Sequence, residues 1–104
     1  MILLRIVSNE EAQVKEVASF LLQRKLAIDV NLKRNIERWS WNGNSLENRK
    51  IFLLEAKTKA LLFPKIDKLI REKIERNLPE IYSLPIVNMD WEQAEALTGE
   101  IEQV

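Results

Sequence analysis

The chain of 104 residues contains no cysteine and no histidine, and each absence excludes a class of chemistry. Without cysteine there is no disulfide, no thiol nucleophile and no thiolate metal site. Without histidine there is no imidazole acid–base group and no imidazole ligand, the commonest protein ligand for metals. A functional site must therefore be built from carboxylates, amides, hydroxyls, lysine, arginine and aromatic rings.

Glycine, proline and net charge are also scarce. Two glycines, three prolines and 46% hydrophobic residues are typical of an ordered globular protein, and the length predicts a single domain over residues 1–104. Sixteen basic residues balance sixteen acidic ones, so no broad field attracts a nucleic acid or an anionic membrane. The apolar run at residues 1–7 is too short for a signal peptide or a membrane span. We therefore expect a cytoplasmic protein without nucleic-acid or membrane partners.

Apolar periodicity predicts a strand followed by a helix in the first quarter of the chain. Residues 2–7 are aliphatic and suit a strand. Ser8 and Glu11 stand at capping-box spacing, which predicts a helix start there. The apolar residues that follow recur at helical spacing down to about residue 25: Val14, Val17, Ala18, Leu21 and Leu22.

A long β-hairpin is predicted over residues 27–57. Its first strand alternates, so that Ile28, Val30 and Leu32 share one face, whereas Ala27, Asp29, Asn31 and Lys33 share the other. The segment 42–44, Asn-Gly-Asn, predicts the turn, and residues 51–56 return as an apolar strand. Apolar residues fill both faces of the hairpin, which indicates that both faces are covered.

The remaining pattern completes a ferredoxin-like order. A second helix is predicted from about residue 58 to 77, an edge strand with two prolines over 78–87, and a short helix over 90–98 that ends at Gly99. The order β-α-β-β-α-β predicts an α+β sandwich, an antiparallel sheet with helices on one face, plus a short C-terminal helix. Because the helices cover one face only, we expect another copy of the chain to cover the second face.

Several short motifs, taken in order, resemble those of the CutA family of divalent-cation tolerance proteins. The resemblance spans residues 7–87 and rests on Leu26-Ala27-Ile28-Asp29-Val30-Asn31, Trp39-Ser40-Trp41-Asn42-Gly43, Lys57-Thr58, Pro79-Glu80-Ile81 and Leu84-Pro85-Ile86-Val87. It implies a homotrimer, related in architecture to the PII signalling proteins, in which long hairpins embrace neighbouring subunits. It also implies a role in the response to metal ions.

The sequence departs from the family pattern at the residues that would hold a soft metal. Asp29 stands where the family has a cysteine, and Ile74-Glu75-Arg76 stands where it has His-Pro-Tyr. The stretch 31–41 is one residue shorter than the family's bend. The resemblance therefore implies a divergent member whose metal chemistry is lost or changed.

By family position, six residues are candidates for a pocket between subunits: Asp29, Asn31, Trp39, Lys57, Glu80 and Tyr82. Mixed aromatic and polar walls are typical of ligand clefts, but the same groups also fit a polar network that fixes subunit register. Trp39 and Trp41 equally fit packing at an interface. For Asp29 we predict an ion pair with a lysine or arginine of its own or a neighbouring subunit.

Metal binding and catalysis are weaker alternatives. Asp29, Glu55 and Glu80 offer oxygen ligands suited to Mg²⁺ or Mn²⁺, but no ligand spacing demands a metal, so no metal site or cofactor is assigned and weak divalent-cation binding stays open. Lys57 and Glu80 form an acid–base combination without a nucleophile or a phosphate-binding glycine loop, so we expect no enzyme. The expected function is a CutA-like response to divalent cations. The alternative is a PII-like trimeric sensor or assembly module that binds a small ligand at subunit clefts.

Overall fold

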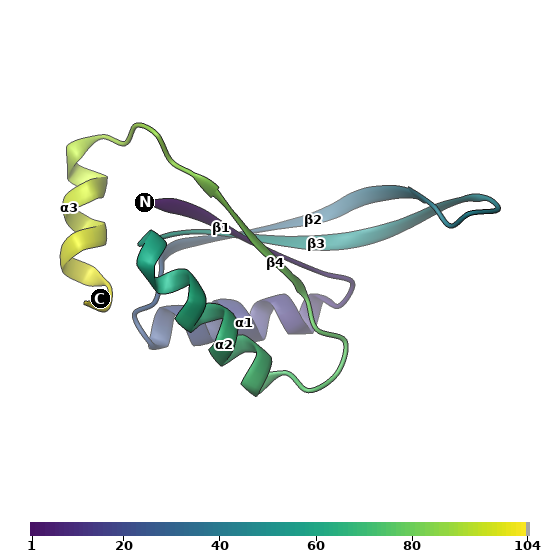
Figure 1. Cartoon of the computed structure of the whole chain (residues 1–104), viewed down its shortest axis with the longest axis horizontal. Coiled ribbons are helices and arrows are strands. Elements are labelled where there is room, and N and C mark those ends of the chain that lie inside the picture. The colour runs from purple at the N-terminus through teal and green to yellow at the C-terminus, as the bar shows by residue number, and fades with distance from the viewer. Residues whose placement is uncertain (104) are drawn as a thin grey trace.

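The chain alternates strands and helices in the predicted order. The structure, a computed structural model, describes residues 1–103. Its elements are β1 (Ile2–Ser8), α1 (Glu11–Gln23), β2 (Ile28–Trp41), β3 (Leu46–Thr58), the 3₁₀ turn η1 (Ala60–Leu62), α2 (Phe63–Lys73), β4 (Glu80–Pro85) and α3 (Trp91–Glu100). The strands form one antiparallel sheet in the order β2-β3-β1-β4, with α1 and α2 together on one side and α3 near the N-terminus (Figure 1). This arrangement confirms the ferredoxin-like fold.

The core lies between the sheet and the two helices. Leu4 and Ile6 of β1 and Leu54 of β3 are fully buried there, and each buried aliphatic side chain contributes about 1.5–3 kcal/mol to stability. The helices supply the facing residues, which are Val14, Val17, Leu21, Ile66 and Ile70. Ala27 also belongs to this core at 3% exposure. The prediction that it faces away was wrong, because Ala27 precedes β2 and still belongs to the connection from α1.

Several element ends differ from the predictions. No capping box forms: the Ser8 hydroxyl accepts the N–H of Glu10 at 3.0 Å, and α1 begins at Glu11 without a side-chain cap. The helix α2 ends at Lys73, earlier than predicted, and β4 is shorter than 78–87. The helix α3 continues through Gly99 to Glu100, so that glycine does not end it.

The β2–β3 hairpin projects beyond the rest of the sheet. The pairing of β1 with β3 ends at Ser8 opposite Phe52, whereas β2 and β3 stay paired from Ile36 and Ile51 out to Trp41 and Leu46. We call residues 36–51 the arm. Six residues of strand span about 20 Å at about 3.3 Å each, and Figure 1 shows the arm extending away from the helices. Its turn is held by Asn42, whose Oδ1 accepts the N–H groups of Asn44 and Ser45, each at 2.9 Å.

Two irregularities in β2 change which face its side chains occupy. The register against β3 shifts between Ile28 and Asn31 and again between Lys33 and Ile36, and Asp29 (φ 51°) and Asn35 (φ 58°) take the left-handed backbone conformation. Each shift adds one residue to β2, as in a β-bulge. After the second shift, even-numbered residues occupy the face that Asn31 and Lys33 occupied before it. Strict alternation along β2 therefore fails at Asn35.

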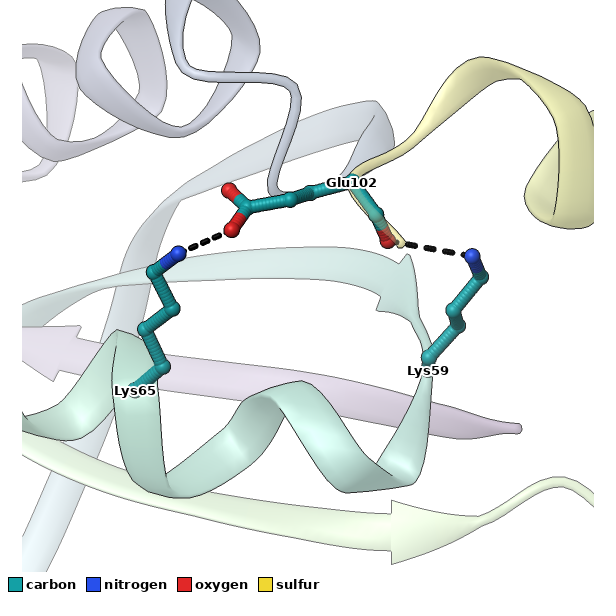
Figure 2. A network of polar contacts seen from close by, with 3 residues as sticks. All are labelled: Lys59, Lys65 and Glu102. Atoms are coloured by element: carbon teal, nitrogen blue, oxygen red, sulfur yellow. Dashed lines mark hydrogen bonds and ion pairs between the residues drawn. The ribbon is translucent and has the colours of Figure 1, made fainter. Parts of the chain in front are cut away.

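The C-terminal segment is fastened to η1 and α2. Leu97 and Ile101 are buried in the core. Figure 2 shows Glu102 between two lysines: Lys59 Nζ donates to its carbonyl oxygen at 3.0 Å, and Lys65 forms an ion pair with its carboxylate. The Glu102 N–H also donates to the carbonyl of Lys25 at 2.7 Å. The tail thus becomes part of the folded unit.

Candidate functional site

The sheet face opposite α1 and α2 carries a charged network around Glu55. Lys33 Nζ lies 2.8 Å from Glu55 Oε1, and Arg5 Nε lies 3.4 Å from Glu55 Oε2. The Glu55 side chain is 14% exposed, so this carboxylate is well shielded in a single chain. The buried Arg5 Nε makes no hydrogen bond within residues 1–103. The network therefore holds a cation with unused hydrogen-bonding capacity.

Tyr82 joins this network through its ring. The Arg5 guanidinium carbon lies 5.4 Å from the Tyr82 ring centroid, and the two residues are register partners on β1 and β4. A guanidinium at this distance from an aromatic face is attracted by its quadrupole. Beyond Tyr82, the same face carries an apolar cluster of Val7, Ile51 and Leu53, with Ile36 against it. The face is thus charged at one end and apolar at the other.

Asp29 and Asn31 lie at the start of β2, next to this network. Asn31 pairs in register with Glu55, and Asp29 occupies the left-handed position of the first bulge. Both side chains are exposed. Among residues 1–103, no lysine or arginine lies within 4.0 Å of the Asp29 carboxylate, so the predicted ion pair does not form within one chain. A partner for Asp29 would have to come from another subunit.

Lys57 and Glu80 lie at opposite ends of the sheet within one chain. Lys57 is paired with Leu3, and Glu80 with Val7, so about 13 Å of β1 separates them at about 3.3 Å per residue. Lys57 Nζ donates to Gln93 of α3, and Glu80 forms an ion pair with Arg38 of β2. One chain does not bring these two groups together as an acid–base pair.

Trp39 lies apart from the other five candidates. In register it stands opposite Asn48 on the arm, on the face opposite to that of Asn31 and Lys33. Trp39 and Trp41 are 61% and 65% exposed, so neither packs against its own chain. Within one chain the structure thus brings Asn31 and Tyr82 to the Glu55 network and leaves Trp39, Lys57 and Glu80 at separate places.

Two residues that contact these groups were not candidates at the sequence level: Arg5 in the Glu55 network, and Gln93, which contacts Lys57. Arg5 is flanked by aliphatic residues. Its alternation with Leu3 and Val7 along the strand was the only sign that it faces away from the core. Gln93, the partner of Lys57, lies 36 residues further on. No local pattern connects these two residues, because their contact depends on how α3 docks.

Oxygen ligands do not converge in one subunit. No group of three aspartates or glutamates that could hold a metal ion occurs among residues 1–103. In the same range no helix is long and apolar enough to cross a membrane.

Two carboxylates outside the Glu55 network have lowered pKa values. The pKa of Glu11 is lowered chiefly by a hydrogen bond from Lys15, and that of Asp90 chiefly by the backbone N–H of Gln93. Glu11 lies at the start of α1 and Asp90 at the start of α3, so these interactions stabilise helix ends and do not belong to the network.

Comparison with known proteins decides the family. Residues 2–96 match the family described as CutA1 divalent ion tolerance protein. The chain belongs to the CutA1 family. The divalent-cation tolerance protein CutA of Thermus thermophilus is 29% identical over 97 residues, which cover 88% of this chain and 91% of that protein.

Solved CutA1 structures share the whole fold. CutA1 from Oryza sativa aligns with a TM-score of 0.86 at 23% identity, covering 99% of this chain and 94% of that one. The structure described as the periplasmic divalent cation tolerance protein CutA from Archaeoglobus fulgidus aligns with a TM-score of 0.83 at 22% identity, covering 98% and 100%. The family identification thus agrees with the architecture from β1 to α3.

Proposed function

We propose that this CutA1 family member acts as a homotrimer in the cellular response to divalent cations, without enzymatic activity. The observation that supports the assembly is the arm. A two-stranded ribbon is at best marginally stable in water, and this one extends about 20 Å past its last neighbouring strand. Its exposed apolar side chains, Trp39, Trp41 and Leu46, need a partner surface.

The mass of the assembly tests this proposal. Light scattering at micromolar concentration should give three times the chain mass of 12.2 kDa. Replacing Trp39 and Trp41 together by alanine should shift the mass toward the single chain, because large aromatic anchors dominate interface energy. Trp91→Ala is the matched control, since Trp91 is 68% exposed on α3, outside the arm. A wild-type protein with a monomer's mass would refute the assembly.

At the position of the family's cysteine, we propose that Asp29 pairs with a cation of a neighbouring subunit instead of binding a soft metal. The left-handed backbone at Asp29 is one that aspartate and asparagine both tolerate. Asp29→Asn therefore removes the charge without straining the strand, and Asp67→Asn on α2 is the matched control. Asp29→Asn should weaken the trimer and leave titrations with Mn²⁺, Mg²⁺, Cu²⁺ and Zn²⁺ unchanged. Loss of metal binding from an intact trimer would identify Asp29 as a ligand instead.

The cellular role needs its own test. Cells that lack this protein should grow differently from the parent strain in elevated Cu²⁺, Zn²⁺ or Mn²⁺, and the wild-type chain should restore growth. The trimer-disrupting tryptophan variant should not restore it. Equal growth of deleted and parent strains at every concentration of these cations would contradict the proposal.

The second candidate is a PII-like sensor that binds a small ligand at subunit clefts. The Arg5 guanidinium beside Tyr82 favours it, since this side chain is 27% exposed and its Nε makes no hydrogen bond among residues 1–103, which leaves hydrogen-bonding capacity for a polar ligand. A ligand that binds only the folded state raises the melting temperature, so a thermal-shift screen of nucleotides and metabolites tests it. Arg5→Lys should abolish any such shift.

The cellular location is also a proposal. We propose a cytoplasmic protein, whereas the Archaeoglobus fulgidus structure is described as periplasmic. Fractionation of cells that carry a C-terminal epitope tag distinguishes the two compartments.

A further inference from the structure

A small cavity lies where β1 ends and the arm continues without it. The part of β3 within the arm, from Ile51 back to Leu46, has no strand beside it on the side of β1. This leaves a notch between the arm and the segment that leads into β4. The cavity has a volume of about 220 Å³ and an apolar floor of Val7, Ile51 and Leu78. That volume lies below the range of about 300–1,000 Å³ typical of drug-sized ligands. The notch therefore suits an ion or a small molecule.

Two arginines with like charges face each other in this cavity. Arg38 of β2 and Arg49 of β3 are direct register partners, and both line the notch. Like charges directly opposite on neighbouring strands destabilise a sheet unless an anion compensates them. Glu80 forms an ion pair with Arg38, but no carboxylate among residues 1–103 lies within 4.0 Å of the Arg49 guanidinium. One positive charge is left without a partner.

The polar rim offers more hydrogen-bond donors than acceptors. Asn77 Nδ2 donates to Asn9 Oδ1 at 2.8 Å, which leaves the Asn9 amide N–H₂ free to donate. Two guanidinium groups and a side-chain amide thus line a space in which Glu80, the one carboxylate of the described lining, is already paired with Arg38.

We propose that this notch binds a small oxyanion, a carboxylate or a phosphate, held by Arg49 and Arg38 and by the side-chain amide of Asn9. Guanidinium groups bind both oxyanions through paired N–H donors, and charge-assisted bonds of this kind are the strong ones. The site lies within one chain and is distinct from the Glu55 network.

Isotope-labelled protein titrated with sodium phosphate and, separately, with sodium succinate tests the site, with sodium chloride at equal ionic strength as the reference. The amide signals of Ser8, Asn9 and Leu78 should shift and saturate with at least one of the two oxyanions, and the comparison identifies which. Arg49→Gln should weaken binding at least tenfold. Arg34→Gln, the same change on the neighbouring strand β2 and outside the notch, should alter it less than twofold.

Glu80→Gln adds a test of opposite sign. Removing the carboxylate that competes for Arg38 should strengthen binding several-fold, whereas Glu37→Gln on the other face of the arm should not. The proposal would be overturned if neither anion saturated the amide shifts below about 10 mM, a concentration weaker than the dissociation constants of common biological sites. Equal effects of Arg49→Gln and Arg34→Gln on binding would also overturn it. So would a changed assembly mass in Arg49→Gln when the wild type binds neither anion. The last result would place a neighbouring subunit in the notch.

Discussion

Thr58, at the end of β3, makes a buried hydrogen bond that links the two ends of the hairpin. Its side chain is fully buried, and its hydroxyl donates to the carbonyl of Leu26 at 2.6 Å. Leu26 lies just before β2, three residues ahead of the bulge at Asp29. Thr58→Val removes this donor while keeping nearly the same volume. We predict that it destabilises the protein although valine is the more hydrophobic residue.

The size of the stability loss in Thr58→Val follows from the Leu26 carbonyl, which loses its hydrogen-bond donor. A neutral hydrogen bond contributes about 0.5–1.5 kcal/mol net, but a buried acceptor left without a donor costs about 1–3 kcal/mol. The Leu26 residue is fully buried, so water does not readily replace the hydroxyl. The expected loss for Thr58→Val is therefore about 1–3 kcal/mol. Thr58→Ser keeps the hydroxyl and loses one methyl, for about 0.8 kcal/mol plus a small cavity term.

Urea unfolding of the three proteins at one protein concentration gives these differences, since the stability of an oligomer depends on concentration. Thr58→Val should be the least stable of the three. If Thr58→Val were as stable as the wild type, the hydrogen bond to Leu26 would contribute nothing, and hydrophobic burial alone would explain Thr58.

Three further predictions concern the strand, the C-terminal helix and its cap. Asn35→Gly should leave stability nearly unchanged and Asn35→Val should lower it by about 1–2 kcal/mol, because the left-handed backbone at φ 58° excludes β-branched residues; urea unfolding measures both. Leu97→Ala should lower the free energy of unfolding by about 3–5 kcal/mol, because Leu97 is fully buried. Lys65→Met should lower it by about 1 kcal/mol or less, because the ion pair of Lys65 is partly exposed. Equal losses would mean that the ion pair rather than the core holds α3. The pKa of Asp90 is lowered by the Gln93 N–H, so its stabilising effect is complete above the unfolded value and is lost as the pH falls below about 4. Asp90→Asn keeps a capping oxygen but removes the charge, so it should make thermal stability between about pH 2 and 4 less dependent on pH and should lower it slightly at pH 7.

The sequence predicted the order of the elements because the apolar periods are long and unbroken in β1, α1 and α2. It did not predict the face of Trp39. Alternation counted from Ile28 places Trp39 with Asn31, but the extra residue at Asn35 reverses that assignment. Nothing in the residues themselves marks a bulge, because asparagine is also common in regular turns and loops. The contacts Lys57–Gln93 and Arg38–Glu80 depend on how distant segments dock, so no spacing rule reaches them.

The bulge at Asn35 has a consequence for changes in chain length. Deleting this one residue would restore strict alternation from Asn31 outward and rotate the outer part of β2 by one side-chain position. That would move the indole rings of Trp39 and Trp41 to the opposite surface of the ribbon. Deleting two residues would keep their orientation and only shorten the reach. Inserting or deleting an odd number of residues in this strand therefore changes which surface of the ribbon meets a neighbour. Inserting or deleting an even number changes only how far the ribbon extends.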